Sequence, residues 1–189
     1  MPLVSSQPPA ARPKLSVVMI TYRHEAYIAK AIESVLIQNV DFPVELVIGE
    51  DCSPDGTRAI VRHYADKYPA VIRPLLPQNN VGMMNNFIAT LEATRGEYVA
   101  LLEGDDYWTD PEKLSKQVTY LEENPPCALC HHRVFYLKDE MLTKEFPKTH
   151  LRKERIPGSE LAYGNFIQTC AVVFRRSHVP KAIRDFASS

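Results

Sequence analysis

Three carboxylates, Glu103, Asp105 and Asp106, directly follow the apolar run Tyr98–Leu102. A short continuous apolar run is typical of a strand buried on both faces of a parallel sheet. We therefore expect the acids just outside the carboxyl edge of that sheet, where open α/β sheets bind ligands. Carboxylates this close raise each other's pKa unless a positive charge lies among them, and a divalent cation carrying a phosphate-bearing substrate would supply it. A solvated acidic turn at the end of a core strand is the alternative.

A second acidic pair, Glu50 and Asp51, follows another apolar run, Val44–Gly49. Because the carboxyl ends of parallel strands meet at one edge of a sheet, we expect both groups of acids at that edge. A carboxylate after the second run can accept a hydrogen bond from a nucleobase N–H or a ribose hydroxyl. The acids at 103–106 can hold a metal on two phosphates. Together they predict a site for a nucleoside diphosphate.

Strand-like and helix-like segments alternate along the chain and predict how these acids are positioned. Short apolar, β-branched runs predict strands at 15–21, 44–49, 71–76, 98–102, 128–137 and 169–174. Apolar residues at helical spacing predict helices between the earlier strands, and a helix over 112–123 with Asp110 as its N-cap. The alternation predicts an α/β fold with a mostly parallel sheet and right-handed crossovers.

The last third of the chain has a weaker pattern. Segment 138–157 is charged and without periodicity, which predicts a mobile loop over one face. Its basic residues would either contact a phosphate-bearing acceptor or a membrane surface, or simply be solvated. A short helix is predicted at 159–165.

Composition and charge exclude several classes of protein. The 189 residues are 45% hydrophobic and carry a formal net charge of −1, which suits one soluble domain and gives no basic field for nucleic acid. No apolar run reaches the roughly 18 residues that span a bilayer. Residues 1–13, rich in Pro, Ser and Ala, are expected to form a flexible tail. Four cysteines are too few for a disulfide scaffold and fit a reducing cytoplasm.

The standard motifs of other nucleotide and hydrolase folds are missing from the sequence. There is no G-x-G-x-x-G, no G-x-x-x-x-G-K-[ST] and no G-x-S-x-G. A nucleotidyltransferase would need a Gly-rich basic loop after the first strand, and residues 22–25 contain no glycine. The C-x-x-C-H pattern at 127–131 has no second ligand pair at zinc spacing, which favours buried cysteines in a strand.

Four short motifs resemble those of family 2 glycosyltransferases with the GT-A fold, in the order and spacing of that family. They are Val17–Tyr22, Glu50–Thr57, Asn80–Gly82 and Glu103–Asp106, and the resemblance covers about residues 14–180. It implies a GT-A-type, Rossmann-like, mostly parallel sheet flanked by helices, in a domain over 14–189. It also implies inverting transfer of a sugar from a nucleotide-sugar, commonly a UDP-sugar, to a glycan or lipid-linked acceptor, with Mn²⁺ or Mg²⁺.

The resemblance assigns roles to particular residues. The residues matching nucleotide-sugar-binding positions are Thr21, Tyr22, Glu50, Asp51, Asn80, Gly82, Glu103, Gly104 and Asp105. Asp51 matches the base-binding aspartate. Asp105 is the first choice as metal ligand and Glu103 the second, since they match the outer residues of the family's D-x-D motif. Glutamate at 103 departs from the usual aspartate, and its extra methylene would also allow a ribose contact. Turn formation or ordinary packing is the alternative role for several of these residues.

The sequence does not identify the general base that would activate the acceptor hydroxyl. Inversion needs a general base, normally a carboxylate. In the family this acid follows, by some tens of residues, the strand matched here by Gln168–Arg175, but the only acid after Arg175 is Asp185. The domain is therefore expected to lack its C-terminal acceptor and base segment, with Asp106, His131 and His132 as weak stand-ins for the base.

Two readings of function remain open on these grounds. One is a glycosyltransferase, and the other is a truncated or natural module that binds nucleotide-sugar without efficient turnover. Trp108 and Tyr22 would either stack on an acceptor sugar ring or pack in the core. A cytoplasmic location is expected. If the acceptor is lipid-linked, the location would be the inner face of the membrane.

Overall fold

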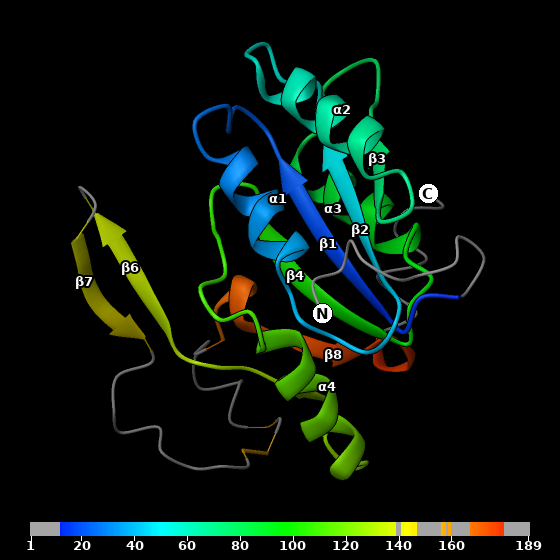
Figure 1. The fold of residues 1–189 in the computed structure, drawn as a ribbon, viewed down its shortest axis with the longest axis vertical. Coiled ribbons are helices and arrows are strands. Elements are labelled where there is room, and N and C mark those ends of the chain that lie inside the picture. Colours follow the sequence, from blue (N-terminus) through cyan, green and yellow to red (C-terminus); the bar gives the residue numbers. More distant parts are fainter. Residues whose placement is uncertain (1–11, 139–140, 147–155, 158, 160–166, 180–189) are drawn as a thin grey trace.

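A six-stranded sheet in the order β3-β2-β1-β4-β8-β5 forms the centre of the fold (Figure 1). The computed structural model describes residues 12–138, 141–146, 156–157, 159 and 167–179. The strands are β1 (Leu15–Thr21), β2 (Val44–Glu50), β3 (Ile72–Leu75), β4 (Tyr98–Glu103), β5 (Leu129–Cys130) and β8 (Val173–Arg175). Strands β1 to β4 are parallel, whereas β8 pairs antiparallel with both β4 and β5. The prediction of a mostly parallel α/β sheet is therefore confirmed.

Helices pack on both faces of this sheet. They are α1 (Ile28–Leu36), α2 (Thr57–Lys67), α3 (Met83–Glu92) and α4 (Lys113–Glu123). Side chains from α1, α2 and α4 join Leu15, Val17 and Met19 in one apolar cluster, whereas α3 packs with Val18 in a second. Because successive strand residues point to opposite faces, the two clusters lie on opposite sides of β1. This double burial explains why the strand is apolar at nearly every position.

The segment predicted as one strand at 128–137 forms two short strands in different sheets. Its first part is β5, paired with β8, and its second part is β6 (Val134–Lys138). β6 pairs antiparallel with β7 (Met141–Phe146) in a separate two-stranded sheet, to the left in Figure 1. The prediction was wrong because a continuous apolar run does not show where a chain leaves one sheet for another.

Strand β7 also corrects the prediction of a loop over 138–157. Antiparallel pairing with β6 gives this charged segment strand structure that its own periodicity did not indicate. Most of 147–157 lies outside the described residues, and so does most of the helix predicted at 159–165.

Several element boundaries differ from the predicted ones by one residue, and two segments after β4 differ in how they begin. Segment 169–174 begins as a 3-10 turn, Thr169–Ala171, and the strand starts only at Val173. The helix predicted from 112 begins at Lys113. Asp110 does not sit at the N-cap position of this helix; instead its Oδ1 accepts a hydrogen bond from the Glu112 N–H (2.9 Å) in the preceding turn.

The amino-terminal end of the described chain belongs to the folded body. Residues 1–11 of the predicted tail lie outside the described residues, but Pro13 is buried and Arg12 Nε donates to Arg95 O (3.3 Å).

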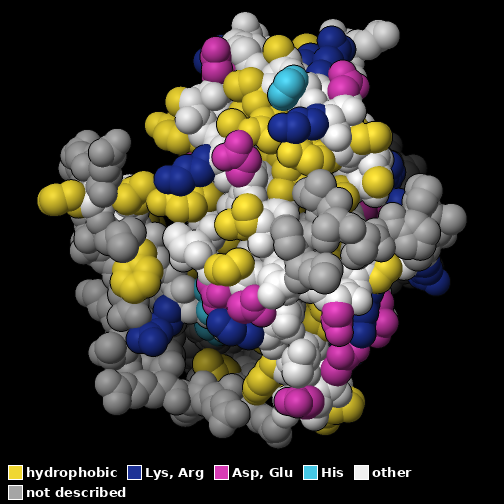
Figure 2. All heavy atoms as spheres, viewed as in Figure 1, with side chains coloured by type: hydrophobic (Ala, Val, Ile, Leu, Met, Phe, Trp, Pro, Cys, Tyr) yellow, Lys and Arg dark blue, Asp and Glu magenta, His cyan; other side chains and the backbone are white. Residues whose placement is uncertain are grey.

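On the face shown in Figure 2, basic and acidic side chains of the described residues are interspersed, in keeping with the formal net charge of −1. Within the described ranges, no helix combines the length and apolarity needed to cross a membrane.

Candidate functional site

The carboxyl ends of β1, β2 and β4 lie side by side at one edge of the sheet. Thr21 pairs with Glu50 across β1 and β2, and Ile20 pairs with Glu103 across β1 and β4. The two acidic strand ends therefore flank the end of β1, which confirms that they share one edge. This is the edge at which open α/β sheets bind ligands.

The acidic cluster at the end of β4 consists of Glu103, Asp105 and Asp106. Burial, together with the negative charges of Asp106 and Asp105, raises the pKa of Glu103 to about 7. Burial also raises the pKa of Asp106, and the nearby Asp105 adds to this rise. Side-chain hydrogen bonds from Thr169 to Glu103 and from Cys170 to Asp106 oppose the two shifts. The cluster therefore favours the binding of a proton or a cation.

The raised pKa of Glu103 predicts a stability change with pH. Between its ordinary value of 4.5 and about 7, the folded protein holds a proton on Glu103 that the unfolded chain has lost, so this group destabilises the fold as pH rises through that window. Glutamine does not titrate, so Glu103→Gln removes this loss. We expect the free energy of unfolding of the variant, relative to the parent, to be higher at pH 8 than at pH 5 by about 1 kcal/mol, after allowance for solvent screening. Urea unfolding at both pH values measures this. Glu123→Gln, on the exposed end of α4, is the control, and an identical pH dependence of Glu103→Gln and parent would contradict the raised pKa.

Gly104 allows β1 and β4 to approach closely beside the acids. Its N–H donates to Ile20 O (3.0 Å), and a Cβ at this position would lie 2.5 Å from Thr21 Oγ1. Thr21 Oγ1 lies 3.2 Å from His24 Nδ1, and His24 Nε2 lies 3.7 Å from Asp105 Oδ2. His24 thus joins the site from the loop after β1. The sequence prediction missed it, and only its spacing of three residues from Thr21 could have indicated it.

The donor set of the acidic cluster fits a hard divalent cation that is shared with a ligand. The Asp105 side chain is 53% exposed, and the raised pKa of Glu103 reflects burial first and then the negative charges of Asp106 and Asp105, which a cation would offset. Among the described residues, no group of three or more His, Cys, Asp or Glu is arranged to hold a metal ion by itself. The protein would therefore supply one or two carboxylates, with phosphate oxygens and water completing the shell, as is usual for Mg²⁺.

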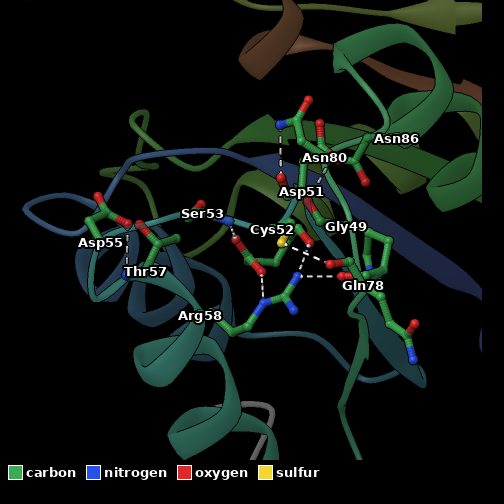
Figure 3. Close-up of polar contacts among 12 residues, drawn as sticks. Gly49, Asp51, Cys52, Ser53, Asp55, Thr57, Arg58, Gln78, Asn80 and Asn86 are labelled. Carbon is green, nitrogen blue, oxygen red and sulfur yellow. Dashed lines mark hydrogen bonds and ion pairs between the residues drawn. The ribbon is translucent and has the colours of Figure 1, made fainter.

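Asp51 fixes the loop that precedes α3 against the end of β2 (Figure 3). Its Oδ1 accepts a hydrogen bond from Val81 N (2.7 Å), its Oδ2 accepts one from Gly82 N (3.0 Å), and Asn80 Nδ2 donates to its carbonyl oxygen (2.9 Å). Gly82 has φ 85°, a conformation that favours glycine. The structure therefore brings Asp51, Asn80 and Gly82 together at the predicted edge.

Glu50 lies next to Asp51 in sequence but faces the protein interior. Its side chain is fully buried, pairs with Arg58 and accepts a hydrogen bond from Ser53 N (2.6 Å). The expectation that Glu50 contacts a nucleotide does not fit this geometry, because the side chain has no exposed surface and its carboxylate is ion-paired with Arg58. Successive side chains at the end of a strand point to opposite sides, which accounts for the different surroundings of the two acids.

Trp108 packs in the core instead of facing solvent. It is 5% exposed, its indole N–H donates to Cys170 O (2.8 Å), and Lys113 Nζ lies 3.9 Å from the ring centroid. An acceptor platform at Trp108 does not fit this burial, because both a hydrogen bond and a cation–π contact already occupy the indole. Tyr22, directly after β1, is 38% exposed and remains accessible to a ligand.

A cavity of about 770 Å³ lies at the opposite edge of the sheet. Its lining includes Lys14, just before β1, and Glu97, just before β4, together with Arg12 and Arg176. It therefore lies at the amino ends of the strands whose carboxyl ends carry the acids. We assign the candidate site to the carboxyl edge, where charged and polar side chains from several strands converge.

These features define an α/β domain with two acidic strand ends at the carboxyl edge of its sheet. The model of the family described as Glycosyl transferase family 2 matches residues 16–179. The chain belongs to this family, which confirms the resemblance drawn from the four motifs.

The curated relatives that the chain matches are longer than the chain itself. The chain is 48% identical over 164 residues to "Uncharacterized protein Rv1520" of Mycobacterium tuberculosis, a match that covers 86% of the chain and 47% of that relative. It is 36% identical over 117 residues to "Putative teichuronic acid biosynthesis glycosyltransferase TuaG" of Bacillus subtilis, covering 62% of the chain and 45% of TuaG. The chain thus spans about half the length of the curated relatives it matches.

Solved structures share the fold. TarS 1-349 of S. aureus in complex with UDP-GlcNAc matches with a TM-score of 0.62 and 23% identity, covering 87% of this chain and 46% of the TarS 1-349 chain. The mannosyltransferase PcManGT of Pyrobaculum calidifontis, in complex with GDP-Man and Mn²⁺, matches with a TM-score of 0.55 and 24% identity, covering 68% of this chain and 38% of PcManGT. At these identities the matches establish the GT-A fold alone.

Proposed function

We propose that this domain binds a nucleotide-sugar, with UDP as the nucleotide, and that it forms the donor half of an inverting glycosyltransferase. The observation that carries the proposal is the meeting of two acidic strand ends at one edge of the sheet, on either side of Thr21. Membership of Glycosyl transferase family 2 supports sugar transfer, and the complexes of TarS and PcManGT show that proteins of this fold bind nucleotide-sugars.

The nucleoside half of the donor is assigned to the ends of β1 and β2. Thr21 and Tyr22 line this part of the edge, and the backbone around Asn80 and Gly82 closes it. Asp51 accepts a nucleobase N–H through carboxylate lone pairs that its two hydrogen bonds to Val81 and Gly82 leave available.

The diphosphate half is assigned to the acidic cluster, with Asp105 as the principal ligand of Mn²⁺ or Mg²⁺ and Glu103 as the second. A cation bound there would stabilise the negative charge of the departing nucleoside diphosphate. Gly104 keeps the backbone close to Thr21, since a Cβ at this position would meet the Thr21 and His24 side chains.

The acceptor half of the reaction is assigned more coarsely. The proposed acceptor is a glycan or a lipid-linked sugar, with the reaction in the cytoplasm or at the inner face of the membrane. Asp106 is the proposed stand-in for the general base, as a carboxylate of the acidic cluster. Burial lowers the pKa of His131 and His132 in the segment between β5 and β6, so both remain weaker candidates.

The proposal predicts metal-dependent binding of UDP. We expect calorimetry to show at least about tenfold tighter binding of UDP with Mn²⁺ than with EDTA, because the cation bridges the diphosphate and the acidic cluster. Equal affinity in both buffers would contradict the metal role. Assays of hydrolysis and transfer with a panel of nucleotide-sugars then distinguish an enzyme from a binding module. Turnover requires the acceptor half of the site, whereas binding requires the donor half alone.

A further inference from the structure

Arg58 joins two chain segments that border the nucleotide-binding edge. It lies in the first turn of α2, and its guanidinium pairs with the Glu50 carboxylate at the end of β2. The same group donates to Glu50 O (3.3 Å) and to Pro77 O (2.8 Å), which belongs to the segment after β3 (Figure 3). We call Glu50, Arg58 and Pro77 the Arg58 clamp.

The clamp is built from groups that are costly to separate. Glu50 has no exposed surface, and only 20% of the Arg58 side chain is exposed. Removing one partner of such a pair leaves a buried charge without its counter-charge. The planar guanidinium offers several donors in a fixed arrangement, so a single side chain can hold a carboxylate and two carbonyl oxygens at once.

The segment that the clamp holds, residues 77–82, carries part of the candidate site. Beyond Pro77, Cys52 Sγ donates to Gln78 O (3.3 Å), and Asp51 receives the hydrogen bonds of Asn80, Val81 and Gly82. Arg58 therefore anchors the start of a segment whose end is held by Asp51. Loss of the anchor would leave only the Cys52 and Asp51 contacts described above to position the segment.

We propose that Arg58 is a positioning residue, which docks segment 77–82 onto the end of β2 and thereby sets the shape of the nucleoside half of the site. In this arrangement Glu50 serves as the buried partner of Arg58 and makes no contact with the nucleotide. The effect on nucleotide affinity rests on the proposed function, whereas the docking of the segment does not.

Arg58→Met tests the proposal, with Arg58→Lys as the conservative variant. Arg62→Met is the matched control, because Arg62 lies one turn further along α2 and is exposed. The first measurement is amide hydrogen exchange, followed by NMR, at Val81 and Gly82 with the amides of β1 as reference. We expect exchange at these two amides to be at least about tenfold faster in Arg58→Met, unchanged in β1, and within about twofold of the parent in Arg62→Met.

The second measurement is UDP affinity, determined by calorimetry at a temperature where each variant is folded. We expect Arg58→Met to bind UDP at least about tenfold more weakly, Arg58→Lys to lie between it and the parent, and Arg62→Met to match the parent. Lysine keeps the charge but offers one point of contact in place of the guanidinium fork. If Arg58→Met does not fold, Arg58→Lys carries the same comparison.

The outcomes separate the docking role from the proposed function. Unchanged exchange at Val81 and Gly82, or equal acceleration throughout β1, would overturn the docking role. Faster local exchange with unchanged UDP affinity would overturn the role in shaping the nucleotide site. A parent protein that binds no nucleotide would refute the proposed function, and the exchange data would then decide the docking role by themselves.

Discussion

Asp105→Asn is expected to remove the metal-dependent part of UDP binding while the fold stays intact. The carboxylate is 53% exposed and lies outside the apolar core, so replacement by an amide of the same shape should change the free energy of unfolding by less than about 0.5 kcal/mol. The amide offers no negative charge to a hard cation, so loss of the principal ligand should remove the whole gain in affinity that Mn²⁺ gives the parent, at least about tenfold.

The measurement is calorimetric titration of UDP with Mn²⁺ and with EDTA. In the variant both titrations should give the weak affinity that the parent shows in EDTA. Asp66→Asn, on the exposed surface of α2, should behave as the parent in both buffers. If Asp105→Asn kept the full Mn²⁺ effect, the principal ligand would have to be sought at Glu103 or Asp106.

The positions of the acids could be predicted because they depend on long buried strands. β1, β2 and β4 are buried at most positions and carry mainly apolar residues, and such runs predict parallel strands whose carboxyl ends coincide. The observed register between Thr21 and Glu50, and between Ile20 and Glu103, follows from that rule. Three of the four family motifs fall on these strand ends, and the fourth, Asn80–Gly82, lies in the loop before α3, where it binds Asp51.

The direction of individual side chains at those ends was harder to predict. Glu50 and Asp51 are equivalent as acids in the sequence, yet Glu50 pairs with Arg58 and Asp51 binds backbone N–H groups of the next loop. Their different roles depend on partners 8 and 30 residues away along the chain. Pattern reasoning over local windows does not include such partners.

The carboxyl-terminal third shows the same limit at the level of whole elements. The apolar run over 128–137 supplies a strand to each of two sheets, and β7 takes its structure from pairing with β6. The 3-10 turn at Thr169–Ala171 replaces the start of a predicted strand at the place where Thr169 and Cys170 meet Glu103 and Asp106. In each case a tertiary contact overrides the local preference of the residues.

Asp51→Ala is expected to have the largest effect on stability at the candidate site. Asp51 is 3% exposed, and its carboxylate accepts hydrogen bonds from the Val81 and Gly82 N–H groups. Both hydrogen bonds are only partly buried and Val81 is 41% exposed, so water can partly replace the lost acceptor and each lost hydrogen bond should cost about 0.5–1.5 kcal/mol. We therefore expect the free energy of unfolding to fall by about 1–3 kcal/mol, measured by urea unfolding. Asp66→Ala is the control, and a change of less than about 0.5 kcal/mol in Asp51→Ala would contradict this role for the carboxylate.

The same variant distinguishes the two halves of the proposed donor site. Asp51 belongs to the nucleoside half, so Asp51→Ala should weaken UDP binding both with Mn²⁺ and with EDTA, when measured at a temperature where the variant is folded. Asp105 belongs to the diphosphate half, so Asp105→Asn should weaken it only with Mn²⁺. Because the acids lie on opposite sides of the end of β1 and share none of the contacts described above, we expect the effects of the two substitutions on binding free energy to be additive within about 0.5 kcal/mol. Strong non-additivity in the double variant would mean that the two acids act on one shared group of the ligand.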